Sequence, residues 1–173
     1  MQAIDGRSVV VDDNFCRIWT SGSGESYEFK NICESIRDHI ANNGKLFIGT
    51  DSFITGRQCI FATAICLHGA NDQNGGKYFF KRSKTPKKNF PKLLLRMLKE
   101  AQDSIMIAIK LSELFPDADV EIHLDIGTGK KNKTSKFIST LTSYTKSAGF
   151  KCKIKPHAWA SASVADKHSK QYL

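Results

Sequence analysis

The sequence predicts an α/β domain built on a five-stranded mixed sheet in the order 3-2-1-4-5, with strand 2 antiparallel and helices on its faces. Three apolar segments in the first half, 45–51, 58–68 and 76–82, are separated by turn-forming residues, as in antiparallel hairpins. Two further strand-like segments, 119–125 and 150–156, alternate with helical patterns, which is typical of parallel crossovers. A chain of 173 residues with 40% apolar content has room for one core.

The chain begins with the segment that carries the weakest structural signal. We expect residues 1–25 to form an N-terminal extension and residues 26–173 to form the folded domain. Within the extension, "RSVVV" (7–11) is compatible with a short strand. Apolar residues at three- and four-residue spacing then predict an extra N-terminal helix from Tyr27, closed by "NNG" at 42–44.

The remaining elements follow from turn residues and apolar periodicity. Thr55 and Gly56 turn the first strand into the second, and "GANDQNG" (69–75) turns the second into the third. Right-handed crossovers place the fourth strand beside the first, in parallel. The predicted later helices span about 92–114, 134–148 and 160–170.

Charge is unevenly distributed along the chain, which carries a net +9. Residues 1–44 hold 4 Lys/Arg against 7 Asp/Glu, whereas residues 45–173 hold 22 against 10. Such an uneven distribution of charge is typical of proteins that bind a polyanion, of which nucleic acid is the commonest. The alternative is that the lysines only keep a small domain soluble.

Several protein classes are disfavoured by the sequence. It contains no apolar run of about 18 residues and no basic-then-apolar N-terminal pattern, so we expect neither a membrane span nor a signal peptide. The five cysteines are scattered without paired spacing, which indicates free thiols and disfavours zinc. We therefore expect a cytoplasmic protein without membrane contact.

Two predicted strands end with a carboxylate. "LFIGTDS" (46–52) carries Asp51, and "IHLDIG" (122–127) carries Asp125. Because these strands are expected to be adjacent and parallel, both carboxylates reach one edge of the sheet, and alternation places them on one face together with His123. Neighbouring carboxylates repel unless a cation lies between them, and oxygen ligands favour Mg²⁺ or Mn²⁺ over zinc.

Two helical acids are ambiguous from their local sequence. Glu100 lies on an apolar stripe, where a carboxylate needs a partner such as a metal ion, but it can also extend to solvent and pair with Arg96. Asp166 has Lys170 four residues later, the spacing of an ordinary surface ion pair. Local sequence leaves both alternatives open.

Six short motifs in a fixed order give the chain a family resemblance. They are "IGTDS" (48–52), "GGKYFF" (75–80), "RMLKEAQ" (96–102), "IHLDIGTGKKNKTSK" (122–136), "GFKCKIKPHAWA" (149–160) and "ADKHSK" (165–170). With the four acids, these motifs resemble the YkuK-type ribonuclease H-like proteins over about residues 27–170. The resemblance implies the ribonuclease H-like fold, with the extra N-terminal helix as an addition.

The resemblance also implies a metal site. By position, its ligands are Asp51, Glu100, Asp125 and Asp166, which would hold two Mg²⁺ or Mn²⁺ ions ~3.5–4 Å apart for displacement at phosphorus. His168, two residues after Asp166, is expected to position water or accept a proton, with a purely structural role as the alternative.

Two lysine-rich segments are predicted to hold a nucleic-acid backbone. The first follows Asp125 and precedes a helix N-terminus, which is itself an anion site, although it is also compatible with an ordinary capped helix start. The second follows the third strand. The predicted contact residues are Lys130, Lys131, Lys133, Thr134 and Lys136 in the first segment and Lys84, Lys87 and Lys88 in the second.

These observations favour a metal-dependent nuclease acting on RNA, DNA or a hybrid. The first alternative is a catalytically silent nucleic-acid-binding protein of the same fold, which would gain from neutralising the four acids. The second is an ATP-dependent phosphotransferase, because "IGTDS" and "DIGTG" faintly resemble phosphate loops, although a single domain is too small to enclose a nucleotide in that way. The sequence does not specify the nucleic acid, the polarity of cleavage or the oligomeric state.

Overall fold

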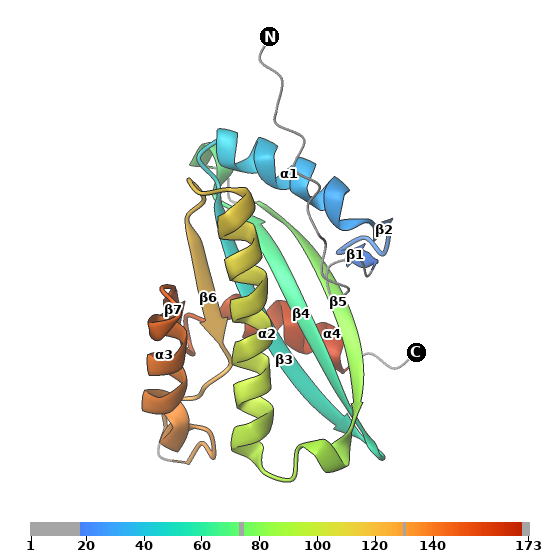
Figure 1. The fold of residues 1–173 in the computed structure, drawn as a ribbon, viewed down its shortest axis with the longest axis vertical. Coiled ribbons are helices and arrows are strands. Elements are labelled where there is room, and N and C mark those ends of the chain that lie inside the picture. Colours follow the sequence, from blue (N-terminus) through green and yellow to red (C-terminus); the bar gives the residue numbers. More distant parts are fainter. Residues whose placement is uncertain (1–17, 73–74, 130, 171–173) are drawn as a thin grey trace.

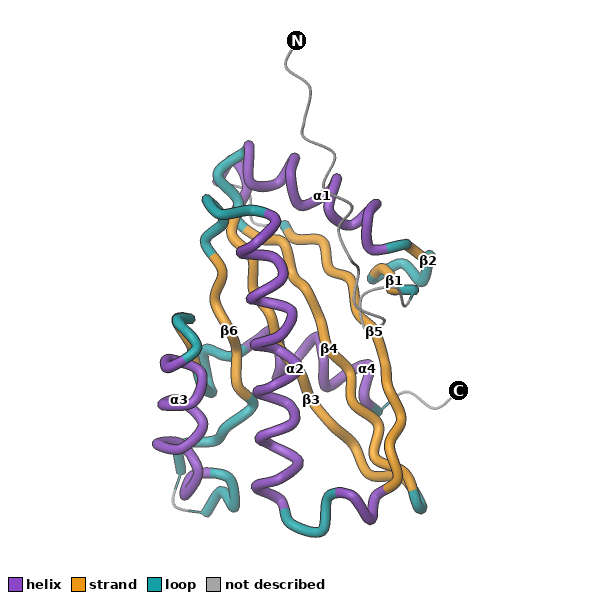
Figure 2. Tube along the Cα trace, in the orientation of Figure 1, coloured by secondary structure: helices purple, strands orange, loops and turns teal. Residues whose placement is uncertain are grey.

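The computed structural model describes residues 18–72, 75–129 and 131–170, which form one twisted sheet with helices on both faces (Figures 1 and 2). The strands are β1 (Trp19–Ser21), β2 (Ser26–Tyr27), β3 (Lys45–Thr55), β4 (Gln58–His68), β5 (Gly76–Pro86), β6 (Val120–Leu124) and β7 (Lys151–Lys153). The α-helices are α1 (Phe29–Ala41), α2 (Leu93–Leu114), α3 (Ile138–Ser147) and α4 (Asp166–Ser169). Single 3₁₀ turns are η1 (Ala70–Asp72), η2 (Lys87–Asn89) and η3 (Ser135–Phe137), and the segment η4 (Ala160–Ala165) is π-helical.

The sheet has seven strands in the order β2-β1-β5-β4-β3-β6-β7. The five contiguous strands β5-β4-β3-β6-β7 follow the predicted order, with antiparallel pairing from β5 to β3 and parallel pairing from β3 to β7. The predicted number of five strands is wrong, because β1 and β2 add an edge beside β5. Strands of two and three residues are too short to produce a periodic pattern.

The predicted N-terminal extension thus contains part of the core. Trp19 is fully buried, and its neighbour Thr20 pairs with Phe80 of β5. The "RSVVV" segment lies outside the described residues, so its expected strand is not part of this description.

Helices form a layer on each face of the sheet (Figure 1). α2 and α3 cover one face, α1 crosses one end of the sheet, and η4 with α4 packs on the opposite face. The side chains of β4 alternate between the two faces of the sheet: Ile65 and Leu67 enter the large core under α2, whereas Ala64 and Cys66 face η4. No helix in the described parts of the chain is long and apolar enough to cross a membrane.

The second layer approaches the sheet unusually closely at Gly49 of β3. A Cβ atom at this position would lie 2.4 Å from the backbone nitrogen of Ser161 and 2.7 Å from the carbonyl carbon of Ala160. Only glycine permits this approach, because backbone atoms cannot move aside as a flexible side chain would. The glycine of "IGTDS" therefore has a packing role.

We predict that Gly49→Ala destabilises the protein by about 1–3 kcal/mol, the usual cost of overpacking a tight contact. Thermal unfolding followed by circular dichroism measures the effect. Gly75→Ala is the matched control, since a Cβ there meets nothing within 4 Å. Equal melting temperatures for the two variants would contradict the close packing of η4 on β3.

Candidate active site

Asp51 and Asp125 lie on neighbouring strands at the same level of the sheet. β3 and β6 are parallel, and their last paired residues are Thr50 and Leu124, so the next residue on each strand is a carboxylate. Asp51 is buried, and its Oδ2 accepts a 2.6 Å hydrogen bond from the Ser169 hydroxyl of α4. The structure therefore brings both acids to one level of the sheet, as predicted, but Asp51 lies within β3, which continues to Thr55, rather than at its end.

Glu100 approaches from the opposite face of the sheet. It is buried on α2, and its Oε1 accepts a 2.5 Å hydrogen bond from the hydroxyl of Ser52, the β3 residue after Asp51. Because successive side chains of a strand alternate, Ser52 faces α2 while Asp51 faces α4. β6 ends at Leu124 whereas β3 continues to Thr55. Beyond Leu124, therefore, no β6 backbone lies along this edge of β3 between the two faces of the sheet.

Burial raises the proton affinity of both inner carboxylates. Desolvation raises the pKa of Asp51 to about 6; the Ser169 hydrogen bond lowers it, and the charges of Asp125 and Asp166 raise it. Desolvation also raises the pKa of Glu100 to about 8, against the lowering effect of the Ser52 hydrogen bond, while the Asp51 charge raises it further. These mutual effects show that acids from four separate segments share one electrostatic environment.

Two lysines neutralise the outer acids. Lys155 Nζ lies 2.5 Å from Asp125 Oδ1, and Lys170 Nζ lies 2.5 Å from Asp166 Oδ1. The second contact is the i,i+4 ion pair that the local sequence suggested as the alternative for Asp166. Asp125 Oδ1 is nevertheless buried without a hydrogen-bond partner. The Lys155 contact is thus an ion pair by its distance, without the alignment of a hydrogen bond.

The four carboxylates do not form a ready-made metal cage. Within residues 18–72, 75–129 and 131–170, no three Asp, Glu, His or Cys side chains converge as ligands of one ion. The donor chemistry still suits a hard divalent cation, because every donor is a carboxylate oxygen. The buried acids with raised pKa, Asp51 and Glu100, are groups that such a cation would stabilise.

Comparison with protein families gave a match to the model described as "Ribonuclease H-like" over residues 28–170. The chain belongs to the ribonuclease H-like family. Comparisons with curated proteins and with solved structures gave no match. The family assignment agrees with the mixed sheet and with the resemblance carried by the six sequence motifs.

His168, predicted as a catalytic residue of this ribonuclease H-like site, has the contacts of a packed core residue. Its ring is buried and stacks on Phe80 at 3.5 Å between centroids, and its Nε2 lies 3.2 Å from the Tyr78 hydroxyl. These contacts direct it toward β5 rather than toward Asp51. They fit the structural alternative, and the catalytic role of His168 stays a prediction.

His123 also has a structural role. Its Nδ1 accepts a 3.0 Å hydrogen bond from the Ala160 backbone amide. The ring proton is therefore on Nε2, which donates a 3.1 Å hydrogen bond to Glu121 Oε1. Burial lowers the pKa of His123, which favours this neutral form. The residue thus fastens the start of η4 to β6.

The first basic segment borders a cavity beside Asp125. The cavity has a volume of about 400 Å³, and its walls include Thr128, Lys133, Thr134 and Lys155. Thr134 accepts a hydrogen bond from the Gly127 backbone amide, which folds the loop back onto the strand end. A phosphate in this cavity would meet lysine ammoniums and a hydroxyl next to the carboxylates.

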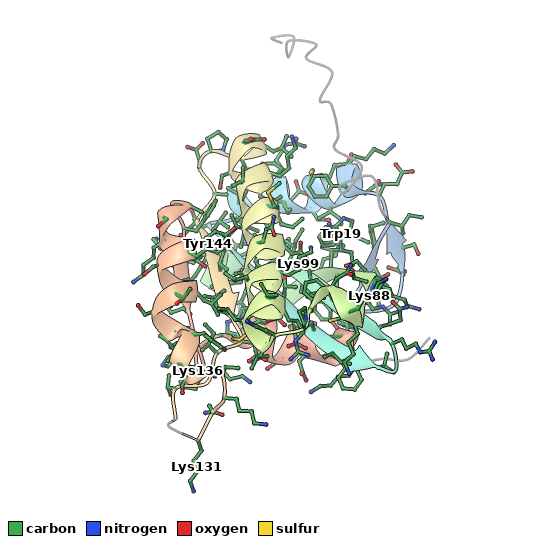
Figure 3. The ribbon with its side chains drawn as sticks, turned by 60° about the horizontal axis from the view of Figure 1, so that its bottom comes forward. Trp19, Lys88, Lys99, Lys131, Lys136 and Tyr144 are labelled. Carbon is green, nitrogen blue, oxygen red and sulfur yellow. The ribbon has the colours of Figure 1, made fainter. Side chains whose placement is uncertain are left out.

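The remaining predicted contact residues are spread over the same end of the molecule. Figure 3 shows Lys136 and Lys88 on opposite sides of α2, with Lys131 extending outward from its loop. Lys84 is exposed on β5, Lys87 and Lys88 are exposed on η2, and Lys136 also lies over the Phe137 ring at 5.0 Å. Lys130 lies outside the described residues.

Sequence reasoning missed the groups that hold the acids in place. Ser52 and Ser169 each follow or lie near a predicted ligand, but a serine beside an acid is too common to indicate a hydrogen bond. Lys155 contacts Asp125 although the two residues lie far apart in the sequence, so local patterning does not reveal the contact. Only the fold brings these residues together.

We predict that Glu100→Gln stabilises the metal-free protein, and more at pH 8 than at pH 5. The folded-state pKa of about 8 lies above the ordinary 4.5, so stability from protonated Glu100 is complete below the ordinary pKa and is lost as the pH rises toward 8. Gln mimics the protonated form at every pH, and its advantage reaches the order of a few kcal/mol.

Urea unfolding in EDTA at the two pH values measures this difference. Glu113→Gln is the control, since that side chain is 61% exposed on the same helix. A Glu100→Gln effect that is equal at pH 5 and pH 8 would show that Glu100 has an ordinary pKa.

Proposed function

We propose that this protein is a divalent-metal-dependent nuclease that hydrolyses phosphodiester bonds in RNA, DNA or a hybrid. The observation that carries the proposal is the shared electrostatic environment of Asp51, Glu100, Asp125 and Asp166, beside a cavity lined by lysines. Carboxylates repel a phosphate group placed beside them, so this arrangement can bind nucleic acid only if cations lie between the two. Membership of the ribonuclease H-like family supports the same chemistry.

Each part of the site has a separate task in this proposal. Asp51 and Asp125 would be shared ligands, while Glu100 and Asp166 would each complete one side of the metal site. Divalent ions held there would supply water activation and charge neutralisation for in-line displacement at phosphorus. Lys133 and Thr134 would bind the phosphate beside Asp125.

The lysine contacts are compatible with this proposal because both side chains can move. Lys155 and Lys170 are 45% and 54% exposed, so each ammonium can leave its carboxylate without exposing core. In the proposed metal-bound form, Lys155 would turn from Asp125 to the phosphate in the adjoining cavity. The same lysine would therefore balance the acid before binding and the substrate afterwards.

A second candidate function is nucleic-acid binding without catalysis. The observation that favours it is the pairing of Asp125 and Asp166 with lysine ammoniums, which leaves a basic surface around neutralised acids. The two candidates differ in one property: only the nuclease requires the carboxylates to take up divalent ions.

We predict that Asp51→Asn and Asp125→Asn each reduce Mg²⁺-dependent cleavage by at least about 100-fold, because each removes a charge on which transition-state stabilisation depends. Labelled RNA, DNA and hybrid duplexes, incubated with Mg²⁺ or EDTA and separated on gels, give the measurement. Asp117→Asn, at an exposed position, should cleave like the wild type. Undiminished cleavage by the Asp51 and Asp125 variants would remove both residues from the mechanism.

We also predict that Mn²⁺ raises the melting temperature of the wild type but not that of the double variant Asp51→Asn/Asp125→Asn. Ligand linkage gives about 2.7 kcal/mol at a metal concentration 100 times Kd, or several degrees for a domain of this size. Differential scanning fluorimetry measures the shift, with the exposed Asp117→Asn as a surface control. A shift that is the same in wild type and double variant, or absent from both at millimolar Mn²⁺, would favour the silent-binder function.

A further inference from the structure

A second cavity lies at the far end of the β3–β4 hairpin, away from the four carboxylates. It has a volume of about 700 Å³, and its walls include Arg57, Gln58, Lys87, Lys88, Phe90 and Pro91. The Lys87 backbone amide donates a 2.8 Å hydrogen bond to the Arg57 carbonyl oxygen, which ties η2 to the hairpin. The cavity walls are therefore held together by main-chain contacts.

The lining combines positive charge with an aromatic ring. Of the described residues that form the walls, three are Lys or Arg and none is Asp or Glu. Phe90 is half-buried and makes an edge-type contact with Phe61 at 5.1 Å between centroids, so its ring is fixed while part of it faces the cavity. Cations beside an aromatic face are the combination that holds the phosphate and base of an unpaired nucleotide.

We propose that this cavity, named here the hairpin pocket, binds one nucleotide of a single-stranded nucleic-acid segment. Its phosphate contacts Arg57, Lys87 and Lys88, and its base stacks on Phe90. A volume of about 700 Å³ is within the range of pockets that bind ligands of nucleotide size. A base-paired nucleotide cannot offer its face to Phe90, so the pocket selects unpaired strands.

The hairpin pocket is connected to the carboxylates through β3 and β4. Phe61, which holds Phe90, is paired across the sheet with Ser52, and Ser52 donates its hydroxyl to Glu100. Gly56 at the pocket lies five residues beyond Asp51, or about 16 Å at the usual strand rise. An unpaired strand whose bases stay stacked, at about 3.4 Å per nucleotide, would cover that distance with about five nucleotides.

This inference extends the proposed function by naming a substrate class: a duplex with a single-stranded overhang of at least about five nucleotides. Fluorescence anisotropy in EDTA tests it, because binding is then measured without cleavage. The probes are a labelled blunt duplex and the same duplex with an eight-nucleotide overhang. We expect the wild type to bind the overhang probe more tightly.

Two kinds of variant separate stacking from charge. Phe90→Leu keeps an apolar contact with Phe61 but removes the aromatic face, and should weaken overhang binding about tenfold while leaving blunt-duplex binding within about twofold. Phe90→Tyr should restore overhang binding. Lys87→Ala/Lys88→Ala should reduce the preference for the overhang and lower the salt dependence of binding by about one phosphate contact. Lys30→Ala/Lys146→Ala removes the same charge from exposed sites on α1 and α3 and should preserve the preference.

The outcomes are distinguishable from failure of the nuclease proposal. Equal loss of blunt and overhang binding in Phe90→Leu, or wild-type binding by both pocket variants, would overturn the hairpin pocket even if Mg²⁺-dependent cleavage were present. Conversely, the protein could prefer the overhang probe through Phe90 and yet cleave nothing. That result would support the hairpin pocket and leave nucleic-acid binding without catalysis as the function. Melting temperatures confirm that each variant is folded.

Discussion

The close contact between η4 and β3 at Gly49 is the constraint on which the site depends. Because no side chain separates the two backbones, the following helix α4 lies directly against the strand, and Ser169 reaches Asp51 at 2.6 Å. His123 fixes the same end of η4 through the Ala160 amide. The position of Asp166 therefore follows from backbone packing at Ala160 and Ser161, rather than from its own ion pair.

The acids reduce the stability of the domain that holds them. Asp51 and Glu100 lose hydration on burial, which raises both pKa values, and neighbouring carboxylates raise them further: Asp125 and Asp166 for Asp51, and Asp51 and Asp125 for Glu100. One serine hydroxyl for each acid offsets only part of this cost. Groups that destabilise a fold and yet are held by specific donors are typical of functional sites, where a ligand supplies the missing stabilisation.

The sequence predicted the parts of this protein that repeat with a period and missed those that depend on tertiary contact. The five strands β5-β4-β3-β6-β7 and the adjacency of Asp51 to Asp125 followed from apolar patterning and crossover handedness. β1 and β2 were missed because two or three residues define no period. The contact of Lys155 with Asp125 and the stacking of His168 on Phe80 were missed because each joins residues that are far apart in the sequence.

The unequal lengths of β3 and β6 explain how acids on the two faces of the sheet can influence one another's pKa. β6 ends at Leu124, whereas β3 continues to Thr55, so β3 has an uncovered edge from Asp51 onward. A carboxylate from α2 on one face and others toward α4 on the opposite face can then affect one another around that edge. Had β6 continued beside β3, its backbone would have separated Glu100 from Asp51. The extended β3–β4 hairpin then carries the same strand on to Arg57, which links the acidic edge to the hairpin pocket within one rigid element.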